Sequence, residues 1–238
     1  MKEKIILEGS ISVKAAIEGK NRKIFSVFAD KNKKDKDIAY ILRIAERDGA
    51  KICRTDREKI SQMTNGSSHG GVCAEVSQRS FVTPEELLND ENPFIILLEG
   101  IEDPYNFGDC IRSAYAAGAT GLLIPERNWM SADAVVARAS AGASERIKTT
   151  AAKDFLPIIY AAKQKGVNLV IAERKDAVSL HDTTLKKPLM LAIGGRLRGL
   201  SKPIFDAADL RVYIPYNNDF KNSLSASAAC SVMSFAVQ

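Results

Sequence analysis

Short apolar segments alternate with amphipathic segments along almost the whole chain, and this alternation limits the folds that it can adopt. The apolar runs have the length of β-strands, and the amphipathic windows have helical spacing. Residues 93–100, PFIILLEG, form a continuous apolar run that is typical of a strand buried on both faces of a parallel sheet. Strands and helices in regular alternation indicate an α/β fold with a mostly parallel sheet.

The segments fall into two blocks joined by a connector. Residues 1–78 are predicted to form a small α/β unit, with strands over 24–30, 50–55 and 72–78, and helices over 37–49 and 55–63. Residues 79–92 are predicted to be a linker with a short helix, because Thr83, Pro84 and Glu86 form a capping-box pattern. Residues 93–238 are predicted to form the larger α/β domain, with strands over 93–100, 121–125, 146–149, 168–173, 189–195 and 210–215, and helices over 108–118, 131–140, 154–165 and 223–237.

Composition excludes several classes of protein. The chain has 238 residues, of which 45% are hydrophobic and 26% charged, so disorder, collagen and coiled coil are excluded. No apolar stretch approaches the roughly 18 residues that a membrane span needs. The first ten residues, MKEKIILEGS, do not have the pattern of a secretory signal. We therefore expect a cytoplasmic protein without a membrane partner.

The four cysteines lie far apart with no CxxC pair, so neither a disulfide framework nor a metal site is expected. A net charge of +5 favours a polyanionic partner. A basic cluster lies near the N-terminus and consists of Arg22, Lys23, Lys31, Lys33, Lys34 and Lys36. Because Asp30, Asp35 and Asp37 lie among these residues, the cluster alone does not separate a nucleic-acid surface from a solvated loop.

Three polar loops follow predicted strands of the second block, at the edge where parallel sheets bind ligands. The first spans residues 99–110 and is followed by Arg112, whose side chain either points back over the loop or forms a surface salt bridge. The second, GGRLRGLS at 194–201, is neither a P-loop nor a dinucleotide-binding fingerprint. The third spans 214–227, and Ser223 is expected to cap the final helix. With only two histidines, His69 and His181, and no nucleophile elbow, a Ser-His-Asp triad is excluded.

The order and spacing of these loops resemble the SpoU/TrmH family of RNA 2′-O-ribose methyltransferases, in the SPOUT superfamily. The resemblance rests on NFG at 106–108 followed by Arg112, on IGGRLRGLS at 193–201, and on the segment from IP at 214–215 to SLSAS at 223–227. Residues 8–28 and 69–76 also resemble the small RNA-binding domain of that family. The likeness thus covers nearly the whole chain.

The resemblance implies a trefoil knot in residues 93–238, S-adenosylmethionine as the cofactor, and a homodimer in which Arg112 completes the partner's site. The residues that it implies for cofactor binding are Gly194, Gly195, Arg196, Ile214, Pro215, Ser223 and Leu224. Those implied for catalysis are Asn106, Arg112 and Ser223. Those implied for RNA binding are Arg22, Lys23, Lys31, Lys33, Lys34 and His69.

The implied reaction is in-line transfer of the sulfonium methyl group to a ribose 2′-hydroxyl, which needs positioning and no metal. Because a guanidinium resists deprotonation, we expect Arg112 to clamp a phosphate and to stabilise the developing alkoxide. Asn106 is expected to fix the geometry of the first loop. By analogy, a separate N-terminal RNA-binding domain favours ribosomal RNA over tRNA as the substrate.

Two residues depart from the family pattern. Arg196 stands where the family usually has Glu, and Ser225 stands where it usually has Asn. The candidates to replace this amide are the side chains of Asn217, Asn218 and Asn222. The departures favour an alternative hypothesis, a knotted RNA-binding protein that binds the cofactor but has lost or altered catalysis. A nucleotide-binding metabolic enzyme would need a phosphate loop or a triad, and the sequence has neither.

Overall fold

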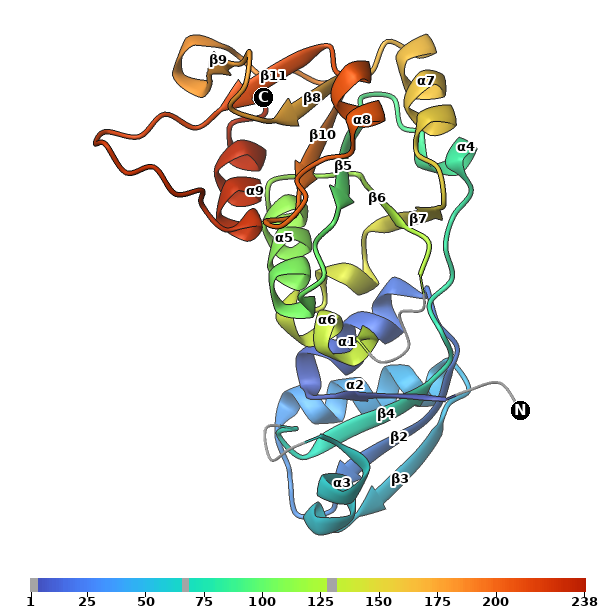
Figure 1. The fold of residues 1–238 in the computed structure, drawn as a ribbon. Coiled ribbons are helices and arrows are strands. Elements are labelled where there is room, and N and C mark those ends of the chain that lie inside the picture. The colour runs from blue at the N-terminus through green and yellow to red at the C-terminus, as the bar shows by residue number, and fades with distance from the viewer. Residues whose placement is uncertain (1–3, 66–68, 128–131) are drawn as a thin grey trace. The chain divides into compact units, whose positions relative to one another are not determined.

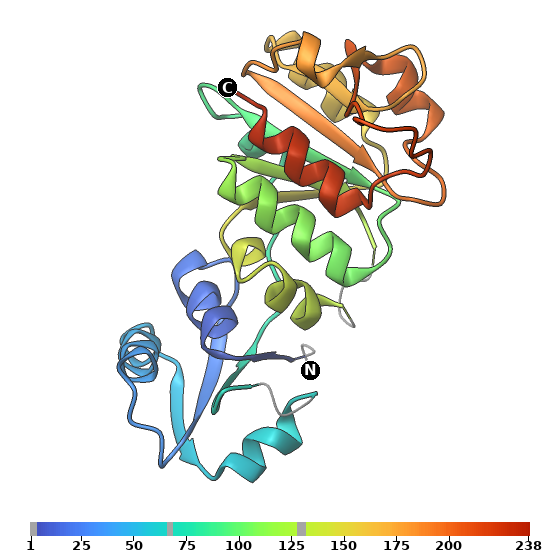
Figure 2. The same cartoon turned by 90° about the vertical axis from the view of Figure 1, so that its left-hand side faces the viewer.

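The computed structural model describes residues 4–65, 69–127 and 132–238, which form two compact units (Figures 1 and 2). Unit 1 comprises Met1–Ser80 and Asn128–Arg146, and unit 2 comprises Phe81–Arg127 and Ile147–Gln238. The predicted fold class is confirmed, because a large parallel sheet follows a small α/β unit. No helix of the described residues is long and apolar enough to cross a bilayer.

Unit 1 is built on a four-stranded sheet in the order β1-β4-β2-β3. Its strands are β1 (Ile5–Glu8), β2 (Ile24–Asp30), β3 (Lys51–Thr55) and β4 (Val72–Val76), and its helices are α1 (Ser10–Gly19), α2 (Lys36–Arg47), α3 (Arg57–Met63), α6 (Asp133–Ala139) and the 3₁₀ turn η1 (Ala143–Glu145). β4 is antiparallel to β1 and β2, whereas β2 and β3 are parallel. The core of the unit lies between one face of this sheet and helices α1 and α2.

The local sequence explains why α2 forms and why α1 was not predicted. Asp35 caps α2 by accepting a hydrogen bond from the Ile38 N–H at 2.8 Å, and the apolar side chains of α2 recur at helical spacing. In α1, by contrast, the buried residues are nearly consecutive, from Ser12 to Ile17. The periodic signal of a one-sided helix is therefore weak in α1.

Unit 1 contains a buried network of two arginines and two carboxylates. The Arg22 guanidinium lies 2.6 Å from the Glu145 carboxylate and 2.7 Å from Asp133. The Arg79 guanidinium lies 2.8 Å from the Asp133 carboxylate and 3.1 Å from the Glu145 carboxylate. Burial by itself would lower the pKa of Arg22, but the hydrogen bond and the charge of Glu145 raise it above its ordinary value. The network attaches the 132–146 segment to the first 80 residues.

The same contacts correct two predicted RNA-binding residues. The Arg22 side chain is fully buried, so it cannot reach a phosphate at the surface. His69 is also fully buried, where its Nδ1 accepts the Gly71 N–H and its Nε2 lies 3.0 Å from the Ser61 hydroxyl. Burial lowers the pKa of His69, so its imidazole is a neutral internal group rather than an RNA contact.

The remaining predicted RNA-binding residues are all at least partly exposed. Lys31 lies 2.6 Å from Asp56, and the Lys33 ammonium donates to the Gly70 carbonyl at 2.6 Å. Lys23 lies 5.7 Å from the centre of the Phe25 ring, and Lys34 is exposed. Their contact with RNA stays a prediction.

Unit 2 is built on a seven-stranded parallel sheet in the order β7-β6-β5-β10-β8-β11-β9. Its strands are β5 (Phe94–Glu99), β6 (Gly121–Pro125), β7 (Lys148–Ala152), β8 (Asn168–Ala172), β9 (Val178–Ser179), β10 (Leu189–Gly194) and β11 (Leu210–Tyr213). Its helices are α4 (Pro84–Leu87), α5 (Pro104–Ala116), α7 (Leu156–Gln164), α8 (Lys202–Ala207), α9 (Ala226–Phe235) and the 3₁₀ turn η2 (Leu180–Asp182).

Helices cover both faces of this sheet, which explains the continuous apolar run of β5. Helices α4, α7 and α8 share one apolar cluster with β5 and β10. Helices α5 and α9 lie side by side on the other face (Figure 2), where the Ser231 hydroxyl donates to the Ser113 hydroxyl at 2.7 Å. β5 and β10 are therefore buried on both sides at the centre of the unit.

Two helix starts differ from the predictions by three residues or more. α5 begins at Pro104 rather than at residue 108, because Asp103 caps it by accepting the Asn106 N–H at 2.9 Å. α9 is capped by Ser225 rather than by Ser223, since the Ser225 hydroxyl accepts the Ala228 N–H at 3.1 Å. The predicted capping box at Thr83 is confirmed.

The predicted domain boundaries assumed consecutive blocks at 1–78, 79–92 and 93–238, and they stay a prediction. The compact units differ from these blocks mainly in one segment, Asn128–Arg146, which belongs with the first 80 residues.

The buried charge network generates a prediction about stability. Glu145→Gln removes one buried negative charge and leaves Arg22 and Arg79 undercompensated. We expect unfolding of unit 1 to become easier by about 3 kcal/mol, as for other buried pairs that lose one partner. Urea denaturation followed by circular dichroism measures the change. Glu46→Gln, at an exposed position of α2, is the control, and equal stability of the two variants would contradict the prediction.

Candidate functional site

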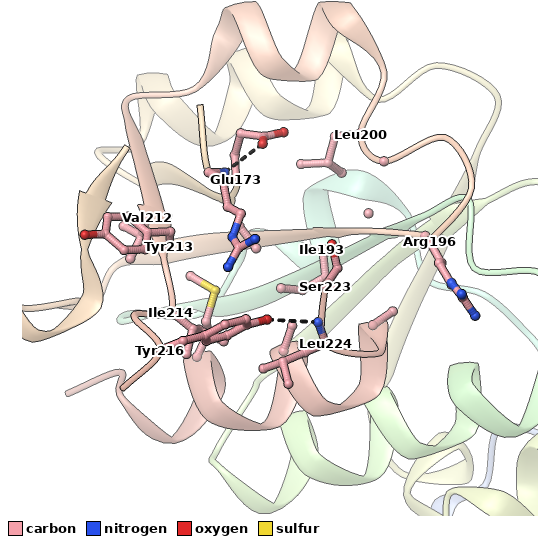
Figure 3. Close-up of a pocket in the computed structure, with 18 residues that line it drawn as sticks. Glu173, Ile193, Arg196, Leu200, Val212, Tyr213, Ile214, Tyr216, Ser223 and Leu224 are labelled. Carbon is pink, nitrogen blue, oxygen red and sulfur yellow. Dashed lines mark hydrogen bonds between the residues drawn. The ribbon is translucent and has the colours of Figure 1, made fainter. Parts of the chain in front are cut away.

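A cavity of about 260 Å³ lies beyond the carboxyl ends of β8, β10 and β11 (Figure 3). We call it the first cavity. Its walls come from the ends of three strands with the loops after them, and from α9 with the residues before it. The lining residues are Ala172, Glu173, Arg174, Ile193, Gly194, Gly195, Arg196, Gly199, Leu200, Val212, Tyr213, Ile214, Tyr216, Ser223, Leu224, Ala226, Ala229 and Met233. This is the edge at which parallel sheets bind ligands, because several strand ends and their loops converge there.

Glycines bring two backbone segments into direct contact beside this cavity. A Cβ atom on Gly195 would lie 1.8 Å from the Gly100 carbonyl oxygen, and one on Gly194 would lie 2.5 Å from the Gly199 carbonyl carbon. The Gly199 N–H donates to the Gly195 carbonyl at 2.8 Å, which closes residues 195–199 into a tight turn. Any side chain at Gly194 or Gly195 would push these segments apart.

The segment before α9 is held over the first cavity by Tyr216. The Tyr216 hydroxyl accepts the Leu224 N–H at 3.1 Å and donates to the Asn222 carbonyl at 3.2 Å. The Arg174 guanidinium lies 4.6 Å from the centre of the Tyr216 ring and donates to the Lys221 carbonyl. The bond from Leu224 to Tyr216 closes one side of the cavity (Figure 3).

The chemistry of the first cavity suits a ligand with a flat apolar part and polar edges. Apolar side chains from Leu200, Val212, Leu224 and Met233 line it. The carboxylate of Glu173, at its β8 edge, accepts the Arg174 N–H at 2.7 Å. Small ligand sites commonly combine such apolar walls with a few fixed polar groups.

A second cavity, of about 480 Å³, adjoins the first. It is lined by residues 100–103, Asn106, residues 195–197 and residues 223–226. The two cavities share Gly195, Arg196, Ser223, Leu224 and Ala226. Two ligands bound in these cavities would therefore meet across the shared wall.

The Asn106 side chain in the second cavity is held by two hydrogen bonds. Its amide nitrogen donates to the Asp103 carboxylate at 2.7 Å, and its amide oxygen accepts the Ser227 hydroxyl at 3.0 Å. Asp103 comes from the N-terminal end of α5 and Ser227 from the first turn of α9. The amide is thus fixed by both helices.

The structure brings together most of the predicted cofactor residues. Those that line the first cavity are Gly194, Gly195, Arg196, Ile214, Ser223 and Leu224, and Pro215 lines neither cavity. Asn106 lines the second cavity. Arg112 lines neither cavity, and it is exposed on α5 without an ion pair among the described residues. The surface salt bridge that was the predicted alternative for Arg112 is therefore not formed among the described residues.

The structure does not support the three asparagines predicted to replace the amide that the family has at position 225. Asn217, Asn218 and Asn222 line neither cavity. The Asn218 amide oxygen accepts the Phe220 N–H at 3.1 Å, and the Asn222 backbone carbonyl accepts the Tyr216 hydroxyl at 3.2 Å. Ser225 does line the second cavity, but its hydroxyl serves as the cap of α9.

Sequence reasoning missed Glu173, Arg174 and Tyr216. Glu173 and Arg174 follow β8, which is far from the loops in sequence but neighbours both β10 and β11 in the sheet. Strand order was not predicted, so nothing marked the end of β8 as part of the site. Tyr216 lay within the third loop, and its aromatic ring directly before two asparagines was the available signal. In the described parts of the chain, no group of three or more His, Cys, Asp or Glu residues is arranged to hold a metal.

Comparison with protein families gives two matches that together span most of the chain. Residues 93–235 match the SpoU rRNA Methylase family. Residues 6–82 match the family described as RNA 2′-O ribose methyltransferase substrate binding.

Individual relatives are similar over nearly their whole length. The 23S rRNA (guanosine-2′-O-)-methyltransferase RlmB of Shewanella oneidensis is 27% identical, over 99% of this chain and 97% of that protein. The AdoMet-bound rRNA methyltransferase of Sinorhizobium meliloti has a TM-score of 0.79 at 23% identity, over 98% of this chain and 86% of that chain. The SpoU methyltransferase AviRb of Streptomyces viridochromogenes, in complex with AdoMet, has a TM-score of 0.79 at 20% identity, over 98% and 88%.

The anchoring of residues 216–224 can be tested by Tyr216→Phe. The variant loses the hydroxyl that binds Leu224 and Asn222, and each lost hydrogen bond is worth about 1 kcal/mol. We expect faster amide exchange at Leu224, measured by hydrogen–deuterium exchange with mass spectrometry. Tyr160→Phe, at an exposed position of α7, is the control. Equal exchange in both variants would show that Tyr216 does not hold the segment.

Proposed function

Because this chain belongs to the SpoU rRNA methylase family, we propose that it transfers a methyl group from S-adenosylmethionine to a ribose 2′-hydroxyl of RNA. The observation that carries this proposal is the pair of adjoining cavities with a shared wall at Gly195, Arg196 and Leu224. The first cavity is the cofactor site and the second receives the acceptor ribose. Ribosomal RNA is the favoured substrate, since the RlmB relatives are named for 23S rRNA.

The walls of the first cavity fit S-adenosylmethionine. Leu200, Leu224 and Met233 offer apolar surface for an adenine ring, and the Glu173 carboxylate can accept hydrogen bonds from ribose hydroxyls. Gly194 and Gly195 allow a ligand to approach the backbone directly. When bound, the cofactor supplies an electrophilic methyl group on a sulfonium ion.

The chain's own residues position the acceptor in this proposal. Asn106 is fixed by Asp103 and Ser227, so it can orient the ribose without rearrangement. Ser223 lies on the shared wall, where it faces both ligands. Arg112 binds the adjacent phosphate and stabilises the charge that develops on the 2′-oxygen.

Arg112 lines neither cavity of its own chain, which supports a role in the site of a second copy. Helical spacing places Tyr105, Arg112 and Tyr115 on one side of α5. Tyr105 and Tyr115 are 55% and 40% exposed, and Val232 and Phe235 on the adjacent helix α9 are 45% and 65% exposed. Large exposed apolar groups on neighbouring helices favour a protein interface. We therefore propose a homodimer through α5 and α9.

Unit 1 is proposed to bind the RNA through its exposed lysines, Lys23, Lys31, Lys33 and Lys34. They stand on the domain that matches the substrate-binding family. Ribosomal RNA as the substrate implies a cytoplasmic protein.

Two variants separate cofactor binding from transfer. We expect Arg112→Ala to abolish methyl transfer to ribosomal RNA while the affinity for S-adenosylmethionine stays within a few fold, because Arg112 lines neither cavity. Gly194→Val is expected to abolish both, because its side chain would collide with Gly199 and Leu200. Calorimetry with S-adenosylmethionine and transfer of a radioactive methyl group are the measurements.

The same measurements on the unaltered protein test the alternative. Cofactor binding without transfer to any ribosomal RNA would favour the RNA-binding protein that has lost catalysis, for which Arg196 on the shared wall is the observation. Unchanged cofactor affinity in Gly194→Val would place the cofactor elsewhere.

The dimer is tested by complementation. Arg112→Ala and Gly194→Val are each expected to be inactive as homodimers, but co-expressed chains form heterodimers with one complete site. Partial recovery of transfer in the purified heterodimer is the expected result. No recovery, in a heterodimer verified by native mass spectrometry, would show that Arg112 acts within its own chain.

A further inference from the structure

The tip of the turn after β10 carries an unusual combination of side chains. Leu197 is 86% exposed, the highest value among the exposed large apolar residues in the described part of the chain. It stands between two exposed arginines, Arg196 and Arg198. We call these three residues the RLR tip. Arg196 and Leu197 both line the second cavity.

The backbone beneath the tip is held rigidly. The Gly199 N–H donates to the Gly195 carbonyl at 2.8 Å, and the Gly195 N–H donates to the Glu99 carbonyl at 2.8 Å. The Ser201 N–H donates to the Glu99 carboxylate at 2.6 Å. Close glycine contacts leave no room for the turn to collapse inward. Leu197 is thus exposed at the tip of a hydrogen-bonded turn.

We propose that Leu197 is an apolar wedge that inserts beside the acceptor nucleotide, and that Arg196 and Arg198 bind the phosphates on either side of it. The proposal rests on the proposed function in one respect, because it takes the second cavity as the place of the acceptor ribose. It names a form of substrate, a single-stranded or locally opened RNA.

The chemistry of the three side chains favours RNA over other partners. Proteins recognise RNA mainly at unstacked nucleotides, and apolar side chains inserted between bases are a known way to hold a strand open. Guanidinium groups are the preferred partners of phosphates. A nucleotide in a regular stack is enclosed by its neighbours, so its ribose can enter a cavity only after the neighbouring base has moved away. An apolar side chain that inserts between the two bases beside the cavity would separate them.

The test uses short single-stranded RNA that carries 2-aminopurine, whose fluorescence rises when the base is unstacked. We expect the unaltered protein to raise the emission at saturation. Leu197→Ala is expected to bind about tenfold more weakly, because the apolar surface of the leucine side chain is no longer buried against the bases, and to leave the emission low. Leu197→Phe, which keeps a large apolar side chain, is expected to retain the rise.

The arginines have a different signature. Arg196→Ala and Arg198→Ala are each expected to lower the slope of log K against log salt by roughly 0.7, the value for one phosphate contact on a single strand. Leu197→Ala should leave that slope unchanged, because it removes no charge. Val178→Ala, at an exposed position of β9 outside both cavities, is the matched control and should change neither quantity.

The wedge is overturned if Leu197→Ala raises the emission as the unaltered protein does, if the unaltered protein raises none, or if neither arginine variant changes the salt slope. Methyl transfer measured in the same preparation separates this result from the proposed function. Transfer that is equally fast in Leu197→Ala leaves the enzyme intact and removes the wedge. A Leu197-dependent emission without any transfer keeps the wedge and removes the enzyme.

Discussion

The candidate site depends on the contact between two backbone segments, the turn after β10 and the end of β5. No side chain separates Gly195 from the Gly100 carbonyl, and this close approach sets the position of the whole 194–201 loop. Residues of that loop line both the first and the second cavity. The position of this loop is set by contacts between peptide groups. Its geometry therefore tolerates almost no added volume at Gly194 or Gly195.

The polar side chains around this backbone frame have separate tasks. Tyr216 and Arg174 hold the segment before α9, and Asp103 and Ser227 hold Asn106. Arg196 lies between the two cavities, where the family pattern has a carboxylate. These contacts do not involve the side chain of Arg196, which is one of the two positions at which the sequence departs from its family. This explains how a chain can keep the fold and the cavities and still differ in the group that faces its substrate.

Much of the parallel sheet could be predicted from the sequence, because a continuous apolar run such as 93–100 has few alternatives in a protein of this composition. The glycine loop was also predictable, since two adjacent glycines after a strand indicate close backbone contact. The roles of Glu173 and Tyr216 could not be predicted, because they depend on β8 lying between β10 and β11 in the sheet. The burial of Arg22 and His69 was missed for a similar reason. Their partners Glu145 and Ser61 are set by tertiary contacts, and a basic residue near other basic residues looks solvent-exposed in a sequence.

The grouping of residues 128–146 with the first 80 residues has a consequence for how such proteins diversify. The chain passes from one unit to the other three times, near residues 80, 127 and 146, instead of once. A single recombination event at the linker would transfer the first 80 residues without Asp133 and Glu145, and would leave Arg22 and Arg79 buried without counter-charges. The substrate-binding unit of this chain is therefore not a freely exchangeable module. Unit 1 and unit 2 must be inherited together, because the segment 128–146 of unit 1 lies in the sequence between the two segments of unit 2.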